Sequence, residues 1–487
     1  MNPILRNVFF TAVLVTFMAG CASAPGEILL PSVEKDKAIG KDTAKQVEAE
    51  MGLYSDAAKT EYLKKVGRRL VDVNPDQRFE YSFAIIDQFE PNAFALPGGW
   101  IYVSRGMLIL TNDEAELANV LGHEMIHVTR RHSVRQMSNS LVPGLLSIPG
   151  LIVGGVVNEQ LGDLINAPVN LIGGAYLASH SRKDEFEADE KGQQLAALSG
   201  YDPASLAPIL DRLEGFVNVS TGEKRIPGFF DTHPTTPDRV ERVIRDAKKI
   251  TWVKQQGIMA SSSEYLKKLD GLLVGENPAV GIFRGPIFLQ PELQLVITFP
   301  EGWKYMNTPQ AVFALAPQKD GMVSLGISAE GTDPAQPATQ FKDAMKDQYG
   351  ITPVRSESLK INGLSSHLVE YVDQSKKQGT HLTVYWIAYR DLIYHMVCLA
   401  PASLKASLDA TALSFRSMNV KEKDSIKENR LRIVTARSGE TLATLSKRTG
   451  NVLDLKMTAV INGIDAEKAL KTGQLIKIAV QQSYSGS

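Results

Sequence analysis

The sequence predicts an α+β protein of several domains, with a mostly helical first half, a mixed sheet domain and a small C-terminal unit. The 487 residues are too many for one compact core, and a chain of this length usually forms roughly two to four domains. Helical periodicity prevails up to about residue 250, and strand-like alternation with glycine- and proline-rich turns prevails after it. The formal net charge is -1 at pH 7, so no nucleic-acid partner is expected.

The N-terminus has the features of a bacterial export signal that ends in a lipidated cysteine. Arg6 supplies a positive charge, and an apolar run that is too short to span a bilayer follows it. The small residues before Cys21 resemble the lipobox of bacterial lipoproteins. This resemblance implies a signal peptide over residues 1–20, lipid on Cys21 and a tether over 21–32. A plain signal peptide with an incidental cysteine is the alternative.

The residue after Cys21 is Ala22, and no aspartate is present there to favour retention at the inner membrane. By resemblance to the lipoprotein sorting rule, the lipid would contact the outer membrane and the chain would face the periplasm. Only Cys398 would then remain unmodified, so no disulfide is expected. Cys398 lies in an apolar run and is predicted to be a buried small hydrophobic residue.

Two amphipathic helices are predicted first, over Val33–Met51 and 56–73. Alternating residues at 81–87 then indicate a strand. The following stretch NAFALPGGWIYVSRGML, residues 92–108, contains a Pro-Gly-Gly turn and indicates a hairpin. The free edge of this hairpin is a natural place for an extended polypeptide to add as a strand. The edge residues are Asn92, Ala93, Phe94, Ala95 and Leu96.

The stretch LGHEMIHVTRRH, residues 121–132, falls on a predicted helix whose capping-box pattern begins at Thr111 and Glu114. An apolar stripe at helical spacing continues it, with members Ala118, Leu121, Met125 and Val128. His123 and His127 are four residues apart, so both imidazoles leave the same side of the helix. Two such imidazoles can bind zinc, and the adjacent Glu124 can act as base on a water. An ordinary solvated polar stripe is the alternative.

Zinc catalysis requires a third protein ligand, and SRKDEFEADEKG, residues 181–192, supplies candidates. Glu185 and Asp189 face the same way on a predicted helix, where two like charges repel unless a cation is near. Glu185 as ligand and Asp189 as the group that orients a ligand histidine make chemical sense. An acidic surface helix is the alternative.

Together with DTHPTTPDRVERV at residues 231–243, these segments resemble the zinc metallopeptidases of the HtpX and BepA type, which are related to the CAAX prenyl endopeptidases. The resemblance covers roughly residues 35–250. It implies a gluzincin-type zincin domain over 33–255 that holds one Zn²⁺ per chain. It also implies that Glu185 is the third ligand beside His123 and His127, and that Glu124 is the catalytic base.

His233 lies in the last of these segments, in a loop before a helix for which Thr236 is the predicted N-cap and Pro237 the first residue. The resemblance implies that His233 approaches the zinc. It would either occupy the open position as a switch or stabilise the oxyanion when substrate is bound. Arg239 could serve the same charge or be a surface arginine. His132 is assigned to the fold and is not counted as a ligand.

The apolar segment at residues 141–177 is interrupted by prolines and glycines, so it is a poor transmembrane helix. It is predicted to fold over the catalytic region as a flap or helix pair, and contact with a membrane is the alternative. A helical, glycine- and proline-rich connector follows at 256–282. Residues 283–420 are predicted to form an α+β domain that resembles the PsbP and DcrB type through FPEGW and SFRSM. This domain is expected to be a packing or partner-binding module.

Residues 421–430 are charge-dense and are predicted to be a linker. Residues 431–480 resemble a LysM domain of βααβ order, through ARSGETLATLSKRTG, AVINGI and TGQLIKI. The resemblance implies binding to the glycan of peptidoglycan. A structural cap on the protease is the alternative.

The sequence as a whole predicts a lipid-anchored periplasmic zinc endopeptidase that cleaves unfolded or extended segments of misfolded or misassembled envelope proteins. One alternative is a chaperone-like outer-membrane assembly factor whose zinc site is held closed by His233. Another is a peptidoglycan-bound scaffold with a dormant protease. A prenyl-protein protease is poorly supported, because the several transmembrane helices of those relatives are not found in this sequence.

Overall fold

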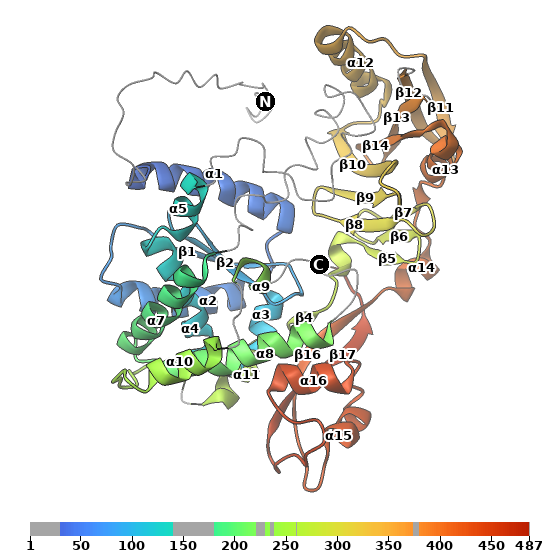
Figure 1. Ribbon diagram of the computed structural model, residues 1–487. Helices are drawn as coiled ribbons and strands as arrows, with labels where there is room; N and C mark the ends of the chain where they lie inside the picture. Colours follow the sequence, from blue (N-terminus) through green and yellow to red (C-terminus); the bar gives the residue numbers. More distant parts are fainter. Residues whose placement is uncertain are drawn as a thin grey trace, which may run out of the picture.

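The structure is a computed structural model that describes residues 30–139, 180–220, 229–233, 238–259, 261–373 and 379–486. Within these ranges, no helix combines the length and the hydropathy that a membrane crossing requires. The predicted signal peptide, Cys21 and the apolar segment 141–177 lie outside the described residues, as do Thr236 and Pro237. In Figure 1 the helical first half and the sheet domain lie side by side, and the C-terminal unit lies below them.

The first half begins with the two predicted helices, α1 (Val33–Met51) and α2 (Ala57–Val73), which are capped by Ser32 and Asp56. A three-stranded sheet follows, in the order β1 (Ser82–Ile86), β3 (Trp100–Ser104), β2 (Ala93–Leu96). β1 runs parallel to β3, and β2 and β3 form the predicted hairpin. β2 is therefore an edge strand.

Helix α4 (Glu114–Thr129) carries the His-Glu-x-x-His motif and is buried on nearly all sides. Its N-cap is Asp113, whose side chain accepts from the backbone N–H of Glu116, and not the predicted Thr111. Thr111 instead ends a short preceding helix, α3 (Arg105–Leu110), and donates its hydroxyl to the Leu108 carbonyl. The predicted cap was wrong because the sequence pattern does not indicate the end of α3, and Thr111 is the first polar residue after its apolar run.

Helix α4 packs very closely against α7 (Arg182–Leu198), the helix that carries Glu185 and Asp189. The approach occurs at two glycines: a Cβ built on Gly122 would lie 2.9 Å from the carbonyl oxygen of Gly192. A side chain at either position would push the helices apart. This contact brings the acidic pair of α7 to the histidines of α4.

Other helices complete the first half around the same core. They are α5 (His132–Asn139), the 3₁₀ turn η2 (Pro203–Ser205), α8 (Leu206–Val219), α9 (Phe229–Thr232), α10 (Arg239–Ala247) and α11 (Ser262–Leu269). The connector adds β4 (Leu273–Val274) and η3 (Pro278–Val280).

The sheet domain contains a seven-stranded antiparallel sheet in the order β11-β12-β13-β14-β10-β9-β8 and a smaller sheet in the order β15-β7-β6-β5. Its strands include β7 (Leu295–Thr298), β10 (Met322–Glu330), β13 (Thr380–Tyr389) and β14 (Leu392–Pro401). The others are β5 (Ile282–Arg284), β6 (Ile287–Gln290), β8 (Lys304–Asn307), β9 (Ala311–Leu315), β11 (Arg355–Ile361), β12 (Leu364–Asp373) and β15 (Arg416–Ser417).

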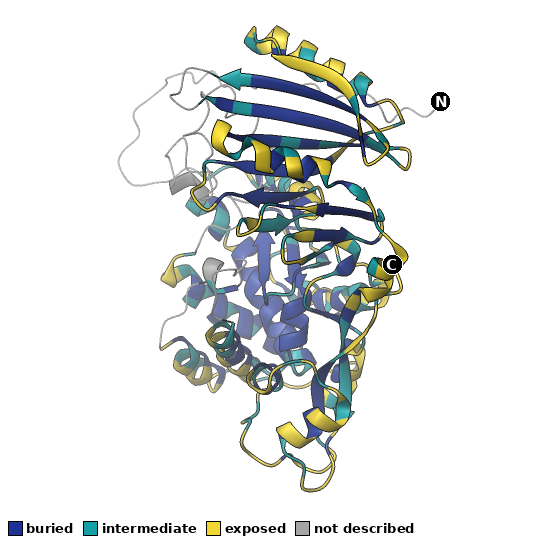
Figure 2. Ribbon diagram, turned by 90° about the vertical axis from the view of Figure 1, so that its right-hand side faces the viewer, coloured by how far each residue is buried: buried dark blue, intermediate teal, exposed yellow. Residues whose placement is uncertain are grey.

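Two helices cover opposite faces of the large sheet. α13 (Ala402–Leu413) shares a core with Tyr385, and α12 (Ala335–Tyr349) shares another with the next residue, Trp386. Adjacent residues of a strand point to opposite faces, so this sheet is buried on both sides. Figure 2 shows its central strands buried and the outer sides of the helices exposed. Cys398 is buried in this domain and unpaired, as predicted.

The C-terminal unit has the expected βααβ order: β16 (Lys427–Thr435), α15 (Leu442–Thr449), α16 (Leu455–Asn462) and β17 (Leu475–Ser483). The predicted linker at 421–430 is wrong, because these residues form helix α14 (Val420–Ser425) and the start of β16. A charge-dense segment can still be ordered when it pairs with neighbours, and here β16 pairs with both β17 and β4.

The C-terminal unit contacts the helical half through this sheet, through a shared hydrophobic core and through a buried lysine. Met457 and Ile461 of α16 belong to the same hydrophobic core as α4. Lys477 of β17 is fully buried, and its ammonium group donates to the carbonyls of Ile109 and Thr111 just before α4. The unit therefore packs as part of the helical half, as the structural-cap alternative expected, while its resemblance to LysM stays a prediction.

Candidate metal centre

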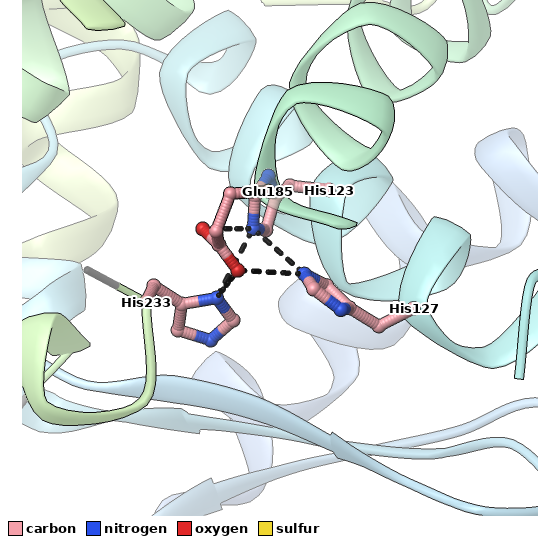
Figure 3. Close-up of side chains that lie close together, drawn as sticks. All are labelled: His123, His127, Glu185 and His233. Carbon is pink, nitrogen blue, oxygen red and sulfur yellow. Dashed lines mark hydrogen bonds and ion pairs between the residues drawn. The ribbon is translucent and has the colours of Figure 1, made fainter. Parts of the chain in front are cut away.

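Four buried side chains converge between α4, α7 and the end of α9: His123, His127, Glu185 and His233 (Figure 3). One ligand atom from each lies within 4.8 Å of the others. The Nε2 atoms of His123 and His127 are 3.0 Å apart, and His233 Nδ1 is 3.0 Å from Glu185 Oε1. None of the four side chains is more than 2% exposed. The structure thus brings together the three predicted ligands and the predicted switch residue.

This cluster fits a metal ion of the zinc type. Two imidazoles and a carboxylate are the donor set of catalytic zinc sites, and each nitrogen must present a lone pair to the ion. Glu124 lies beside the cluster, and neither of its buried oxygens has a hydrogen-bond partner among the described residues. A fully buried carboxylate without a partner is costly in a protein interior. A cation with a bound water would supply the missing partner.

Asp189 and Arg239 contact the side chains of the predicted ligands His123 and Glu185. Asp189 Oδ1 is 2.9 Å from His123 Nδ1, the ring nitrogen that faces away from Glu185. Arg239 donates from Nε and Nη2 to the two oxygens of Asp189, at 2.8 Å each, and its Nη1 is 3.0 Å from Glu185 Oε2. Because Arg239 is only 1% exposed, the surface-arginine alternative is wrong. Its contacts are with the carboxylates that hold and orient ligands.

The charge of Arg239 decides the protonation of Asp189. Burial alone would raise the pKa of Asp189, but the charge of Arg239 and the hydrogen bonds from His123 and Arg239 bring it below its ordinary value. Asp189 therefore stays ionised and accepts the Nδ1–H of His123, which leaves His123 Nε2 free to bind a metal.

His233 fills the space between the base and the ligands. Its Nδ1 is 3.2 Å from His123 Nε2, and its Nε2 is 3.5 Å from Glu124 Oε1. The ring stacks on Phe229, with centroids 4.3 Å apart, and hydrogen-bonds to the backbone of Ala93. Burial and then the charge of Arg239 lower the pKa of His233 to about 3, so the ring is neutral. A neutral imidazole in this position can coordinate a metal.

The predicted substrate strand lies next to the cluster. Ala93–Leu96 form β2, whose outer side has no paired strand in the part of the chain that the structure describes. Asn92 precedes the strand, and its backbone is already paired with Ser104. The segment that ends at His233 covers the start of this edge, because the backbone N–H of Phe229 donates to the Pro91 carbonyl.

Two further histidines lie at the site that sequence reasoning did not place there. His132 Nδ1 is 3.0 Å from His127 Nδ1, and the ring centroid of His180 is 4.0 Å from that of His127. His132 follows the motif by five residues, a spacing that does not repeat on a helix face. His180 had no local signal. Only the folded chain reveals either contact.

Metal binding is expected to strengthen as the pH rises to about 7 and then to level off. Burial raises the pKa of Glu185 to about 7, against the lowering effects of His123 and Arg239. A metal binds the ionised carboxylate, so below this pKa binding must release a proton, and apparent affinity should fall about tenfold per pH unit. Competition with a chelator between about pH 6 and pH 8 measures this. A flat profile would contradict it, and Glu190→Gln on the outer side of α7 is the control.

Comparison with known proteins identifies similar chains. Residues 57–246 match the sequence model of peptidase family M48. The beta-barrel assembly-enhancing protease of Yersinia pestis is 30% identical over 239 residues, which are 48% of this chain and 48% of that protein. The mitochondrial metalloendopeptidase OMA1 of Schizosaccharomyces pombe is 27% identical over 216 residues, or 44% of this chain and 61% of that protein. The chain therefore matches about half the length of the first of these relatives.

The comparison with solved structures includes a cyanobacterial protein. The cyanobacterial PsbP of Synechocystis is 15% identical and covers 29% of this chain and 98% of its own length, with a TM-score of 0.23. That score is too low to assign a shared fold. The resemblance of residues 283–420 to PsbP stays a prediction.

Proposed function

We propose that this chain, whose residues 57–246 match the sequence model of peptidase family M48, is a zinc-dependent endopeptidase that cleaves extended or unfolded polypeptides. The observation that carries the proposal is the buried cluster of His123, His127 and Glu185 beside the unpartnered carboxylate of Glu124. The match of residues 57–246 to the family model supports the expected metallopeptidase domain, and the identity of the metal and the activity of the whole chain are part of the proposal.

Each residue has a role in this reaction. His123, His127 and Glu185 would hold the zinc ion, which supplies a Lewis acid for the scissile carbonyl when bound. Glu124 takes a proton from the attacking water and delivers it to the leaving amine. Asp189 holds His123 in the correct tautomer, and Arg239 keeps Asp189 ionised. When the His233 ring leaves the open coordination position of the metal but stays beside it, the ring can donate a hydrogen bond to the developing oxyanion.

The substrate would bind as an additional strand on β2. Main-chain pairing with this edge requires an extended segment and tolerates many side chains. Ala93–Leu96 are buried, so this edge must be uncovered before a substrate can pair with its backbone. This recognition favours unfolded loops and misassembled chains over compact domains. The similarity of this chain to a beta-barrel assembly-enhancing protease supports β-barrel proteins as substrates.

The cellular placement is also proposed. Cys21, if lipidated, would attach the chain to the outer membrane on its periplasmic side, where such substrates occur. The C-terminal unit would bind peptidoglycan through its exposed end, which includes Ser438, Gly439, Glu467, Lys468 and Ala469. Sedimentation with purified cell-wall sacculi tests the glycan contact.

The proposed activity is tested by metal content and by cleavage of an unfolded protein such as casein. The chain without residues 1–21 should contain one zinc ion and cleave casein at internal bonds. A chelator should abolish cleavage, and added zinc should restore it. Stoichiometric zinc with no cleavage of any unfolded substrate would contradict the peptidase proposal, and so would cleavage that survives complete metal removal.

A mostly closed, chaperone-like protein is the second candidate, and the position of His233 favours it. His233→Ala should raise casein turnover, because it removes the ring that lies between Glu124 and the ligands. If the open state is about one tenth of the population, the gain approaches about tenfold. Initial rates at equal zinc content measure this.

The double variant Glu124→Gln/His233→Ala is the control and should be inactive. Its inactivity would show that the higher casein turnover of His233→Ala comes from the site that contains Glu124. A lower rate for His233→Ala would contradict a closing role and assign His233 to oxyanion stabilisation instead. Binding of unfolded clients without turnover by either protein would favour the chaperone-like function.

A further inference from the structure

A break separates the motif helix from the helix that follows it. α4 ends at Thr129, and Arg131 adopts a left-handed backbone conformation with φ of 55°. Residues other than glycine adopt this conformation unfavourably. Helix α5 then begins at His132. An arginine held in this conformation requires surrounding structure that stabilises it.

That support comes from helix α1, about a hundred positions earlier in the chain. Arg131 Nε and Nη2 donate to the two carboxylate oxygens of Asp36, at 2.6 Å and 2.9 Å. Nη2 also donates to the carbonyl of Pro31. Asp36 is 1% exposed, so this pair is shielded from water. A bidentate, buried arginine–carboxylate pair fixes both groups geometrically.

The break at Arg131 places His132 against the predicted metal ligand His127. On a continuous helix, a residue five positions after His127 would lie about 140° around the axis and could not contact its ring. Here the two rings meet edge to face, with centroids 4.8 Å apart and Nδ1 atoms 3.0 Å apart. The contact exists because α4 ends at Thr129 and the left-handed Arg131 interrupts the helical backbone before α5 begins.

The proton positions follow from the neighbours. His127 Nε2 faces the cluster, 3.4 Å from Glu185 Oε1, so it must present its lone pair to a metal. The proton of His127 is then on Nδ1, and His132 Nδ1 must accept it. His132 carries its own proton on Nε2, which faces Asp184 and Glu187 at 3.5 Å each. Both rings have one consistent tautomer.

We propose that His132 is a positioning residue that holds His127 in its metal-binding tautomer and orientation, and that the ion pair between Arg131 and Asp36 of α1 fixes the position of His132. The proposal rests on the metal site of the proposed function. His123 is held in the same way by a carboxylate, Asp189. The two ligand histidines thus have separate supports, and the support of His127 depends on the N-terminal helix.

The test compares two substitutions of His132 that differ only in the accepting atom. In Asn the Oδ1 atom is bonded to Cγ as Nδ1 is in His, so His132→Asn retains an acceptor. His132→Leu places a methyl group there. Zinc affinity is measured by chelator competition in the full chain without residues 1–21. His132→Leu should weaken it about 10- to 100-fold, and His132→Asn should stay within about threefold of the parent.

The role of Asp36 is tested with a matched pair on α1. Asp36→Asn should weaken zinc binding about tenfold. Glu34→Gln, which removes an exposed carboxylate paired with Lys37, should leave it unchanged. If His132→Leu does not fold, the comparison of Asp36→Asn with Glu34→Gln still tests whether α1 positions His132. Equal affinity for Asp36→Asn and Glu34→Gln would overturn the role of Asp36.

Loss of affinity in both His132 variants would overturn the hydrogen-bonding role, as would wild-type affinity in both. These results are separate from the proposed peptidase activity. A parent that binds zinc but cleaves nothing defeats the proposed activity and leaves these affinity comparisons intact. A parent that binds no zinc defeats both.

Discussion

Glu124→Gln is expected to retain one zinc ion and to lower kcat for an unfolded substrate by about 10³- to 10⁴-fold. Burial, and then the charge of Glu185, raise the pKa of Glu124 well above its ordinary value in the metal-free chain. Glutamine resembles this neutral form in size and shape, so folding should be unaffected. The variant cannot take a proton from water, and only the proton transfer is lost.

The measurement is the casein cleavage rate together with zinc content and melting temperature. Glu190→Gln on α7 is the matched control, because that carboxylate is on the outer side of the molecule and pairs with Lys191. A Glu124→Gln protein that keeps more than about a tenth of the parent rate would show that another group acts as base. Loss of zinc would show instead that Glu124 helps to hold the ion.

Arg239→Ala is expected to cause the largest loss of stability, about 3–5 kcal/mol in the free energy of unfolding of the metal-free chain. Arg239 is the cation that neutralises Asp189 and Glu185, and all three side chains are at least 95% shielded from water. Removing it leaves two buried carboxylates without a counter-charge. Zinc binding should also weaken, because Asp189 would no longer hold His123.

Urea unfolding of the metal-free proteins measures this effect. Arg245→Ala on the same helix is the control, because Arg245 is exposed, and it should change stability by no more than about 0.5 kcal/mol. The double variant Arg239→Met/Asp189→Asn should recover part of the loss, since it removes one of the two unpaired charges. Equal midpoints for Arg239→Ala and Arg245→Ala would contradict a supporting role.

Local patterns in the sequence were sufficient for the parts of the site that one helix presents. The four-residue spacing of His123 and His127 places both imidazoles on one side of α4, and the same spacing places Glu185 and Asp189 on one side of α7. The Pro-Gly-Gly turn predicted the β2–β3 hairpin correctly. Glycine is required at position 99, because its φ is 113° and a Cβ there would clash with the Glu80 carbonyl. These features depend on residues that are close together in the sequence, so helical periodicity and turn residues predict them.

Several strands of the sheet domain left no such pattern. β12 is buried on both faces, so its residues do not alternate, whereas β11 is an exposed edge strand with mostly polar residues. The charged segment 421–430 was misjudged for a related reason. Its β16 residues are ordered by pairing with β4, about 150 residues earlier, and composition alone cannot indicate a distant partner.

The sequence by itself therefore predicted the reaction type and determined the faces of the two helices that carry the candidate site. Only the tertiary structure decided how these faces meet, through the contact of Gly122 with Gly192. It also decided that Arg239 is buried between carboxylates and that His132 contacts His127. The physical reason is that helical periodicity specifies directions within one element, whereas these contacts join residues far apart in the chain, and packing of the whole core determines their distances.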